Sequence, residues 1–469
     1  MSVNLNEYFN LGLDSTNNPI EEAGQINVFR TPVDTSSVNL NRITFKVPKS
    51  GLLTADSMLN LQFVLQDTTA TDSQYTLNLI NGAIGAIKRT RILLDNKVLV
   101  DLQRPGLPEI VKLYSRNTQI ELAERDYKLM GNQFRTTVDE EGLEILKTSD
   151  TRYYTNQLAV NSLDRNIILQ PASSKVYGIP IKHLGADFLE AASLPVFLLG
   201  EREMIIEIEF FSDCREYIVT PDKTGGSDVA ANTVKVVVEN CELVTTHIIL
   251  PNNVEQNELA AMRRQPVQYP LLDTYLIKGT VNTSPGGTGA ANNVNYRINF
   301  QNREVHNLLL CPTDIVPSSN SVLANQKSVS LGKEVLQMKI NGQNLFDRPI
   351  TNQANIYQLT TYSENGRALK LPIGACRVDP LTLANMSQST QEFYLDYRGG
   401  CHYVKVDFSN GNNGVFGSGT LMRQAAVIEQ TYTSATVTKP NQKATRDMNF
   451  YPTISKLLSI GANQIAISF

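Results

Sequence analysis

Short segments in which apolar and polar residues alternate dominate this sequence. In the segment 41–48, Ile43, Phe45 and Val47 alternate with polar residues, and a period of two is typical of a β-strand with one buried face. The most regular segment lies within 194–210. There the pattern predicts one face with the apolar residues Met204, Ile206, Ile208 and Phe210, and another with the acidic residues Glu201, Glu203, Glu207 and Glu209.

The same reading predicts many more strands and few helices. Residues 89–102 are expected to form two strands around a tight turn at 95–97. Helices are expected at 106–131, 183–193 and 253–265. The remaining strand segments are 60–67, 232–250, 293–300, 306–312, 327–342, 391–397, 402–408 and 419–433.

The chain has 469 residues, enough for two or three domains. The segment 218–231, IVTPDKTGGSDVAA, is rich in Pro, Gly and Asp and separates two strand-rich stretches. Short strands at even spacing with long loops indicate sandwich or jelly-roll architecture. We therefore expect two sandwiches in tandem, with the polar flanks 1–40 and 436–469 outside the two cores.

The composition and charge of the chain make some classes of function less favourable than others. Hydrophobic residues make up 41% of the chain and charged residues 19%, as in folded soluble proteins. The 42 basic and 46 acidic residues give a net charge of −4, which does not favour nucleic acid or anionic lipid. The first basic residue is Arg30, so we expect neither a basic arm nor a secretory signal. Five dispersed cysteines without a CxxC pair predict reduced thiols in a chain folded in the cytoplasm.

Residues 80–99, INGAIGAIKRTRILLDNKVL, combine spaced glycines with a basic cluster. A phosphate-binding P-loop needs G-x-x-x-x-G-K-[ST] between a strand and a helix. Here Lys88 follows no glycine, Arg89 stands where serine or threonine is required, and a strand comes next. On that strand Arg89 and Arg91 share one face. We interpret this face as solvated or as an interface, and interpret in the same way the arginine pair Arg263 and Arg264.

Candidates for catalysis or metal binding are weak. A glycosidase needs two carboxyl groups across a sugar-sized cleft, whereas glutamates along one strand face are typical of a wet surface or of an interface with basic partners. The acidic run 139–141 is expected to be a loop. The histidines, His183, His247, His306 and His402, form no HxH or HExxH pair. We predict no catalytic residue, no cofactor, no metal site and no enzymatic activity.

Three motifs follow one another in the first half of the chain. A segment with a strand and a Pro-Gly turn (41–65) precedes one with a glycine-rich entry into a strand (79–102), and a Leu-Pro stretch then leads into a long alternating strand (194–210). Their order and spacing resemble the first jelly roll of the major capsid proteins of polinton-like viruses, virophages and related double-jelly-roll DNA viruses. The resemblance is clearest over about residues 40–210 and weaker over 232–433. The matching residues are Pro48, Gly51, Gly82, Gly85, Lys88, Arg89, Leu194, Pro195 and Gly200.

This resemblance implies an all-β chain made of two tandem eight-stranded jelly-roll sandwiches with a few inserted helices. The glycines at 82 and 85 would then serve close packing rather than phosphate binding. The expected divisions are an N-terminal arm at 1–40, a first jelly roll at 41–217, a linker at 218–231, a second jelly roll at 232–435 and a C-terminal tail at 436–469.

The implied function is that of a viral major capsid protein. Homotrimers would form pseudo-hexagonal capsomers, which would build an icosahedral shell around a double-stranded DNA genome. The implied partners are neighbouring capsomers, penton and minor capsid proteins and an internal membrane, without sequence-specific nucleic-acid binding. The protein would be made in the host cytoplasm or a viral factory and reside in the virion, with the terminal flanks beneath the shell.

Two other function classes remain open. A tandem β-sandwich could be a carbohydrate-binding or adhesion protein, although the chain has no tryptophan for a sugar platform and no export signal. A glycoside hydrolase on a jelly-roll scaffold is the enzyme alternative, and it lacks a credible acid pair.

Overall fold

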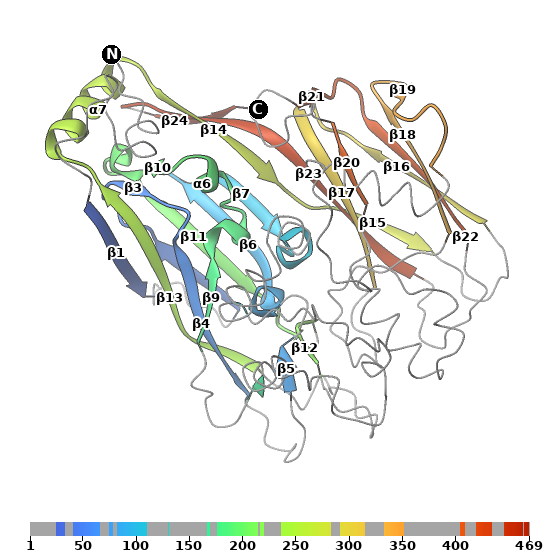
Figure 1. The fold of residues 1–469 in the computed structure, drawn as a ribbon, viewed down its shortest axis with the longest axis horizontal. Helices are drawn as coiled ribbons and strands as arrows, with labels where there is room; N and C mark the ends of the chain where they lie inside the picture. The colour runs from blue at the N-terminus through green and yellow to red at the C-terminus, as the bar shows by residue number, and fades with distance from the viewer. Residues whose placement is uncertain are drawn as a thin grey trace, which may run out of the picture.

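Two β bodies lie side by side in the structure (Figure 1). We call them roll 1, the described residues between 25 and 250, and roll 2, those between 267 and 468. The structure is a computed structural model, and the residues that it describes are 25–32, 41–65, 75–77, 82–109, 130, 167–168, 176–213, 216–219, 236–282, 291–314, 333–350, 404–408, 419–433, 445–462 and 464–468.

Roll 1 has the strand order of a jelly roll. Numbered 1 to 8 along the chain, its principal strands form one sheet in the order 1-8-3-6 and a second in the order 2-7-4-5, the arrangement of two interlocked Greek keys. The eight strands are β1 (Gln25–Pro32), β2 (Arg42–Lys46), β4 (Met58–Leu65), β6 (Ile87–Leu94), β7 (Lys97–Gln103), β9 (Val176–Pro180), β11 (Met204–Phe210) and β13 (Val236–Ile249).

Roll 2 repeats this order. Its first strand is divided in two, β14 and β15, and both parts pair with the eighth strand, β23, which also pairs with the third. The same fold is therefore present twice, although the halves share no evident sequence repeat. The strands are β14 (Val267–Thr274), β15 (Ile277–Asn282), β16 (Ala291–Ile298), β17 (Glu304–Asp314), β18 (Lys333–Ile340), β19 (Gln343–Asn344), β20 (Val404–Asp407), β22 (Ala426–Thr433) and β23 (Thr445–Ile460).

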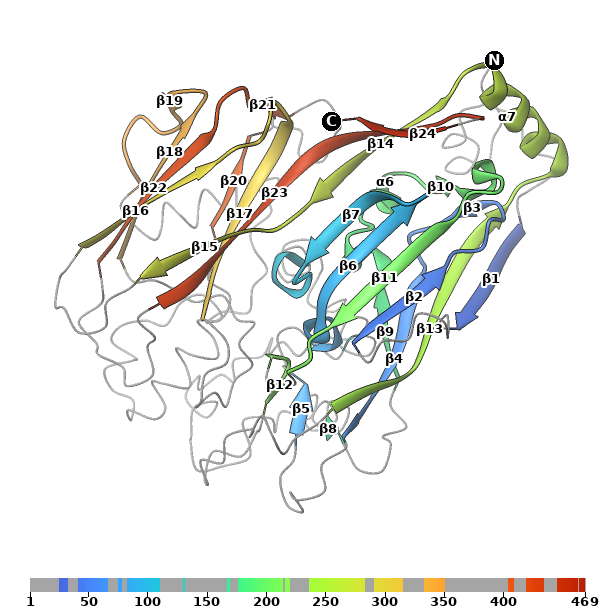
Figure 2. The ribbon, with the colours of Figure 1, turned by 180° about the vertical axis from the view of Figure 1, so that it is seen from behind.

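Shorter elements connect or extend the rolls. Helix α7 (Asn252–Arg264) joins β13 to β14 and thus links roll 1 to roll 2. Strands from three different connections of roll 1, β5, β8 and β12, form a small sheet at one end of that roll (Figure 2). The short elements are β3 (Leu52–Leu53), β5 (Tyr75–Leu77), η2 (Gly82–Ala86), β8 (Ile167–Ile168), η6 (Ile181–Leu184), α6 (Phe188–Ala191), β10 (Leu194–Pro195), η7 (Val196–Leu199), β12 (Ile218–Val219), β21 (Thr420–Leu421) and β24 (Ile465–Ser468).

The alternation of apolar and polar residues explains the local structure of strands that have one buried face. In β11, Met204, Ile206 and Ile208 are at most 1% exposed, while the alternate residues are half-buried. The predicted hairpin is also confirmed, because β6 and β7 are joined by Asp95 and Asn96, both with positive φ, as a two-residue primed turn requires.

Each roll has its own hydrophobic core. One cluster fills roll 1 and extends to roll 2 residues that face roll 1, such as Tyr269 and Leu458. A second cluster fills roll 2 around Phe300, Leu308 and Phe450. The expectation of two cored β bodies therefore agrees with the structure.

The expected domain divisions need correction. Strand β1 lies within the expected arm 1–40 and is the first strand of roll 1. The expected linker 218–231 falls in the connection between the seventh and eighth strands of roll 1, although residues 220–231 lie outside the described residues. Helix α7 is the actual connection between the rolls. The expected tail 436–469 contains β23, the central strand of the larger roll 2 sheet.

The cause of these errors is physical. A Gly- and Pro-rich segment marks any exposed connection, including one inside a domain. Strand β23 is buried on both faces over most of its length, so it lacks the alternation that reveals a half-buried strand.

The helix predictions have mixed outcomes. The helix expected at 253–265 is confirmed as α7, and that at 183–193 is divided into η6 and α6. Of the helix expected at 106–131, residues 106–109 are helical and nearly all the rest lies outside the described residues.

Gly51, one of the motif glycines, provides a test of the packing in roll 1. Its φ is +63°, and an added Cβ would lie 2.2 Å from the backbone oxygen of Ile248 in β13. Gly200 has a similar φ of +61° but nothing within 4 Å of its added Cβ. Because the backbone of Gly200 has a positive φ that residues with a Cβ rarely adopt, we expect Gly200→Ala to cost about 1–3 kcal/mol for this strain alone. We expect Gly51→Ala to cost about 1–3 kcal/mol more than its own backbone strain, because of the clash. Urea unfolding of the two variants measures the difference, and equal losses would contradict the close approach.

Candidate functional surfaces

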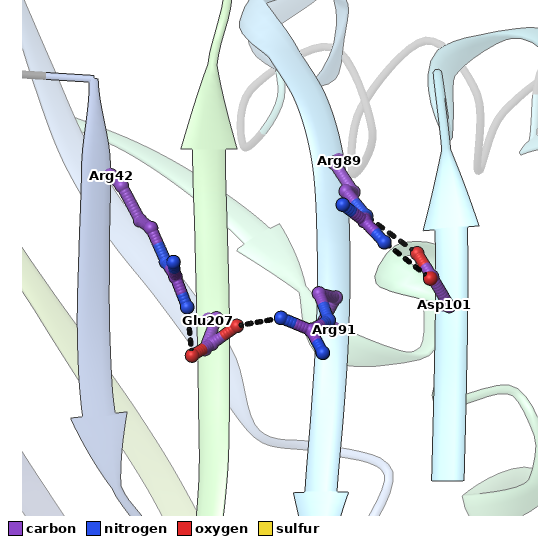
Figure 3. A network of polar contacts seen from close by, with 5 residues as sticks. All are labelled: Arg42, Arg89, Arg91, Asp101 and Glu207. Carbon is purple, nitrogen blue, oxygen red and sulfur yellow. Dashed lines mark hydrogen bonds and ion pairs between the residues drawn. The ribbon is translucent and has the colours of Figure 1, made fainter. Parts of the chain in front are cut away.

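The basic cluster and the glutamates singled out in the sequence meet on one sheet face. Strand β11 lies between β2 and β6, and Glu207 is placed between two arginines of these neighbours, Arg42 and Arg91 (Figure 3). The Nη1 atom of Arg91 is 3.0 Å from the Oε2 atom of Glu207, whose side chain is only 14% exposed. We call this surface the charged face; its residues are Arg42, Lys46, Lys88, Arg89, Arg91, Asp101, Glu203, Glu207 and Glu209.

The basic residues of the charged face are neutralised within the sheet. Arg89 donates two hydrogen bonds to Asp101 of β7, at 2.7 and 2.5 Å, and these bonds raise the pKa of Arg89. Lys88 pairs with Glu209. The basic partners expected for the glutamates are thus supplied by the same chain, and the charged face offers ion pairs rather than a row of free cations.

The glycine-rich segment before this face belongs to the core. Residues 82–86 form the 3-10 helix η2, all of it buried, and β6 begins directly after it. Gly82, Gly85 and the side chains between them are therefore packed inside roll 1, so the reading of this segment as a packing signal is confirmed.

A second polar site holds the two rolls together. The Nζ atom of Lys456 in β23 lies 2.6 Å from Oδ2 of Asp273 in β14, and the two side chains are 7% and 4% exposed. The same ammonium donates a 2.9 Å hydrogen bond to the carbonyl oxygen of Leu99 in β7. Burial raises the pKa of Asp273, while the Lys456 charge opposes that rise. An ion pair of roll 2 thus binds the backbone of roll 1.

Other contacts extend this junction between the rolls. The Tyr451 hydroxyl donates a hydrogen bond to the Arg104 carbonyl oxygen at 3.3 Å. Arg202 of roll 1 donates to the carbonyl oxygens of Gly461 and Ala462 at 2.9 and 2.8 Å. The rings of Phe188 and Tyr269 meet edge to face, 6.2 Å apart. These apolar and charge-assisted contacts fix one roll against the other.

The histidines remain apart. His183 lies 2.9 Å from Glu109 in roll 1, while His247 donates from Nδ1 to the Ser50 carbonyl oxygen at 2.7 Å. His306 bonds Ser455 in roll 2 at 2.7 Å, and His402 lies outside the described residues, as does the acidic run 139–141. No group of three His, Cys, Asp or Glu side chains converges within the described part of the chain.

Two further expectations concern isolated residues. Cys241 and Cys311 are free thiols, and burial raises the pKa of Cys241 to about 12; the other three cysteines lie outside the described residues.

Arg263 and Arg264 are exposed in the last turn of α7, which is a favourable place for positive charge. No helix in the described residues is long and apolar enough to cross a membrane.

Comparisons with known proteins identify the fold. No protein-family model and no curated protein matches the sequence. Among solved structures, the mavirus major capsid protein matches with a TM-score of 0.55 at 13% identity, over 97% of this chain and 93% of that one. A chain of the Sputnik virophage matches with 0.58 at 10% identity, over 96% and 89%. The Faustovirus major capsid protein matches with 0.54 at 10% identity, over 96% and 93%.

The chain has the double jelly-roll fold of these viral capsid proteins. The resemblance seen in residues 40–210 therefore extends through both rolls. The double jelly roll also gives the motif residues a structural role. Leu194 and Pro195 form β10, which pairs with β3 beside Gly51, so these motif residues hold neighbouring connections of roll 1 together.

The buried ion pair between the rolls makes a quantitative prediction. Lys456→Met removes the cation and leaves Asp273 buried without its partner, so we expect a loss of about 3–5 kcal/mol in the free energy of unfolding. The double variant Lys456→Met, Asp273→Leu should recover most of that loss, because no lone charge remains. Urea denaturation measures both, and a double variant no more stable than the single one would refute the explanation.

The buried histidines predict a dependence of stability on pH. Burial is the largest effect at both His247 and His306, and it lowers the pKa of each. The unfolded chain binds these protons near the ordinary pKa of about 6.5. Stability is therefore full above about pH 6.5 and falls as the pH decreases toward the folded-state pKa values. We expect His247→Gln and His306→Gln to flatten this slope in urea unfolding from pH 7.5 to 5.5. Unchanged slopes would show that the histidines do not cause it.

Proposed function

We propose that this chain is a viral major capsid protein with a structural, non-enzymatic role. The observation that carries the proposal is the agreement in fold over nearly the whole chain with the mavirus and Faustovirus major capsid proteins. The agreement includes both rolls and not one jelly roll alone, since this chain covers 93% of each of those chains.

The proposed unit of assembly is a homotrimer. Each chain presents two rolls with the same strand order, held side by side by the buried Lys456–Asp273 pair and the contacts around it. Three such chains around a threefold axis would form a block of six similar bodies with a pseudo-hexagonal outline. Blocks of this shape would tile an icosahedral shell around a double-stranded DNA genome.

Assembly would use surfaces rather than a catalytic centre. The partners in this proposal are neighbouring capsomers, penton and minor capsid proteins and an internal membrane, and the location is the virion. The ion pairs of the charged face support a role without direct genome wrapping, because Lys88, Arg89 and Arg91 are matched by carboxylates of the same sheet. Loops and sheet edges would supply many modest contacts that add up over a closed shell.

Electron microscopy and sedimentation of the purified chain test this proposal. We expect a mass of three chains, about 156 kDa from the 52.0 kDa protomer, and threefold particles with a hexagonal outline in class averages. A stable monomer at high protein concentration would overturn the proposal. Binding on a glycan array by that monomer would instead favour the carbohydrate-binding alternative.

A further inference from the structure

The sign of charge on the charged face alternates from strand to strand. The smaller sheet of roll 1 has the strand order β2-β11-β6-β7, and Figure 2 shows these four strands side by side. The residues in its ion pairs are all basic on β2 and β6, and all acidic on or beside β11 and on β7. They are Arg42 and Lys46 of β2, Glu203, Glu207 and Glu209 of β11 and the residue before it, Lys88, Arg89 and Arg91 of β6, and Asp101 of β7.

The strand register arranges these charges in rows across the sheet. Glu207 lies directly opposite Arg91, and Glu209 lies directly opposite Arg89. Residues directly opposite each other in antiparallel strands point to the same side, so both pairs lie on the charged face. The two central strands thus present an acidic and a basic column side by side, matched row by row.

An apolar row borders the charged rows. Ile205 of β11 lies opposite Lys46 on one side and Leu93 on the other, and Leu93 lies opposite Val98 of β7. Ile205 is half-buried and Val98 is 37% exposed. The charged face therefore also offers apolar area to a partner.

Roll 2 leaves this face accessible. Its contacts with the smaller sheet lie at the edge strand β7, where Lys456 bonds the Leu99 carbonyl oxygen and Lys97 donates a hydrogen bond to the carbonyl oxygen of Ile465. On the other strands the side chains of Arg42, Lys46 and Lys88 are 48%, 55% and 52% exposed. A partner with charge of one sign would be repelled by every second strand, so the face favours a partner that also alternates.

Four strands of alternating sign make the face complementary to itself. A rotation of 180° about an axis parallel to the strands, between β11 and β6, places β6 of a second copy over β11 and its β7 over β2. Every basic strand then faces an acidic one. Each row keeps its height, so Glu207 faces Arg91 of the second copy and Glu209 faces its Arg89. An axis across the strands would instead place each strand over itself, with like charges opposite each other, which is destabilising.

We propose that the charged face of roll 1 binds the charged face of a second copy of this chain, about a twofold axis parallel to the strands. A threefold ring joins two different surfaces of each subunit, whereas a twofold contact uses one surface twice. The contact therefore joins chains of different homotrimers. The inference rests on the proposed capsid function and identifies one surface by which neighbouring capsomers meet.

Two exposed ion pairs provide a matched test. Glu209→Lys reverses a charge on the charged face, where Glu209 pairs with Lys88 and is 30% exposed. Glu429→Lys makes the same change in the smaller sheet of roll 2, where Glu429 pairs with Lys339 and is 37% exposed. Each twofold contact contains position 209 twice. We therefore expect Glu209→Lys to lower the association constant between homotrimers at least about tenfold at low salt, and Glu429→Lys to change it less than about threefold.

Sedimentation at increasing protein concentration measures these constants. The mass of the homotrimer and far-ultraviolet circular dichroism establish that both variants are folded and form the unit of three. Added salt should weaken the association of the unchanged chain, because it screens exposed charges.

A second measurement leaves the ion pairs unaltered. A photoreactive benzoylphenylalanine replaces Val98, and homotrimers that carry it are mixed with isotope-labelled unaltered homotrimers. Mass spectrometry then locates the cross-links that join the two isotopes and so form between homotrimers. Because β7 faces β2 of the second copy, cross-links to Arg42–Lys46 support the proposal.

The outcomes separate this inference from the proposed function. If homotrimers do not associate further, if Glu209→Lys associates like the unchanged chain, or if the cross-links map to other strands, the inference fails while the capsid function stands. A chain that forms only dimers, cross-linked from Val98 to β2, supports the contact and overturns the homotrimer. A chain that stays monomeric at all concentrations overturns both.

Discussion

The two faces of strand β23 belong to different parts of the molecule, and the arrangement of the whole chain depends on this fact. In the first half of the strand, one face completes the core of roll 2 with Met448 and Phe450. The other face presents Tyr451 to roll 1. Farther along, Lys456 reaches the backbone of β7. A strand without a free face cannot rotate or slip by one residue without placing polar groups in one core or the other. The position of roll 2 is therefore fixed by the register of one 16-residue strand.

The ion pairs of the described residues fix how strands and rolls lie together. On the charged face, carboxylates and guanidinium groups alternate across neighbouring strands and satisfy one another. Such pairs contribute little to stability when exposed, but they specify which strands lie together, because a shifted register would bring like charges opposite each other. The buried Lys456–Asp273 pair likewise specifies how the two rolls lie together, because it binds the backbone of roll 1.

The sequence predicts the fold class and the strands with one solvated face, because burial there leaves a visible period of two. This holds for β11 and for the β6–β7 hairpin, whose turn residues also match their conformation. It fails for β23, where both faces are buried, and for β1, whose apolar residues Ile26, Val28 and Phe29 lie on both faces of the strand and give no clean alternation. The junction between the rolls could not be foreseen either. Lys456 and Leu99 are 357 positions apart, and nothing in the local pattern around a lysine shows that a distant carbonyl oxygen will accept a hydrogen bond from it.

Helix α7 has a consequence for the thermodynamics of assembly. It tethers two bodies that would otherwise have to find each other by diffusion. Association of separate bodies sacrifices translational and rotational freedom worth about 4–15 kcal/mol, whereas a short tether makes the same encounter intramolecular. In the proposed threefold block of six rolls, every second roll-to-roll contact would form as the chain folds, and only the alternate contacts would depend on protein concentration. The strength of those alternate contacts can then remain modest, which leaves misjoined subunits free to separate and rejoin while a shell grows.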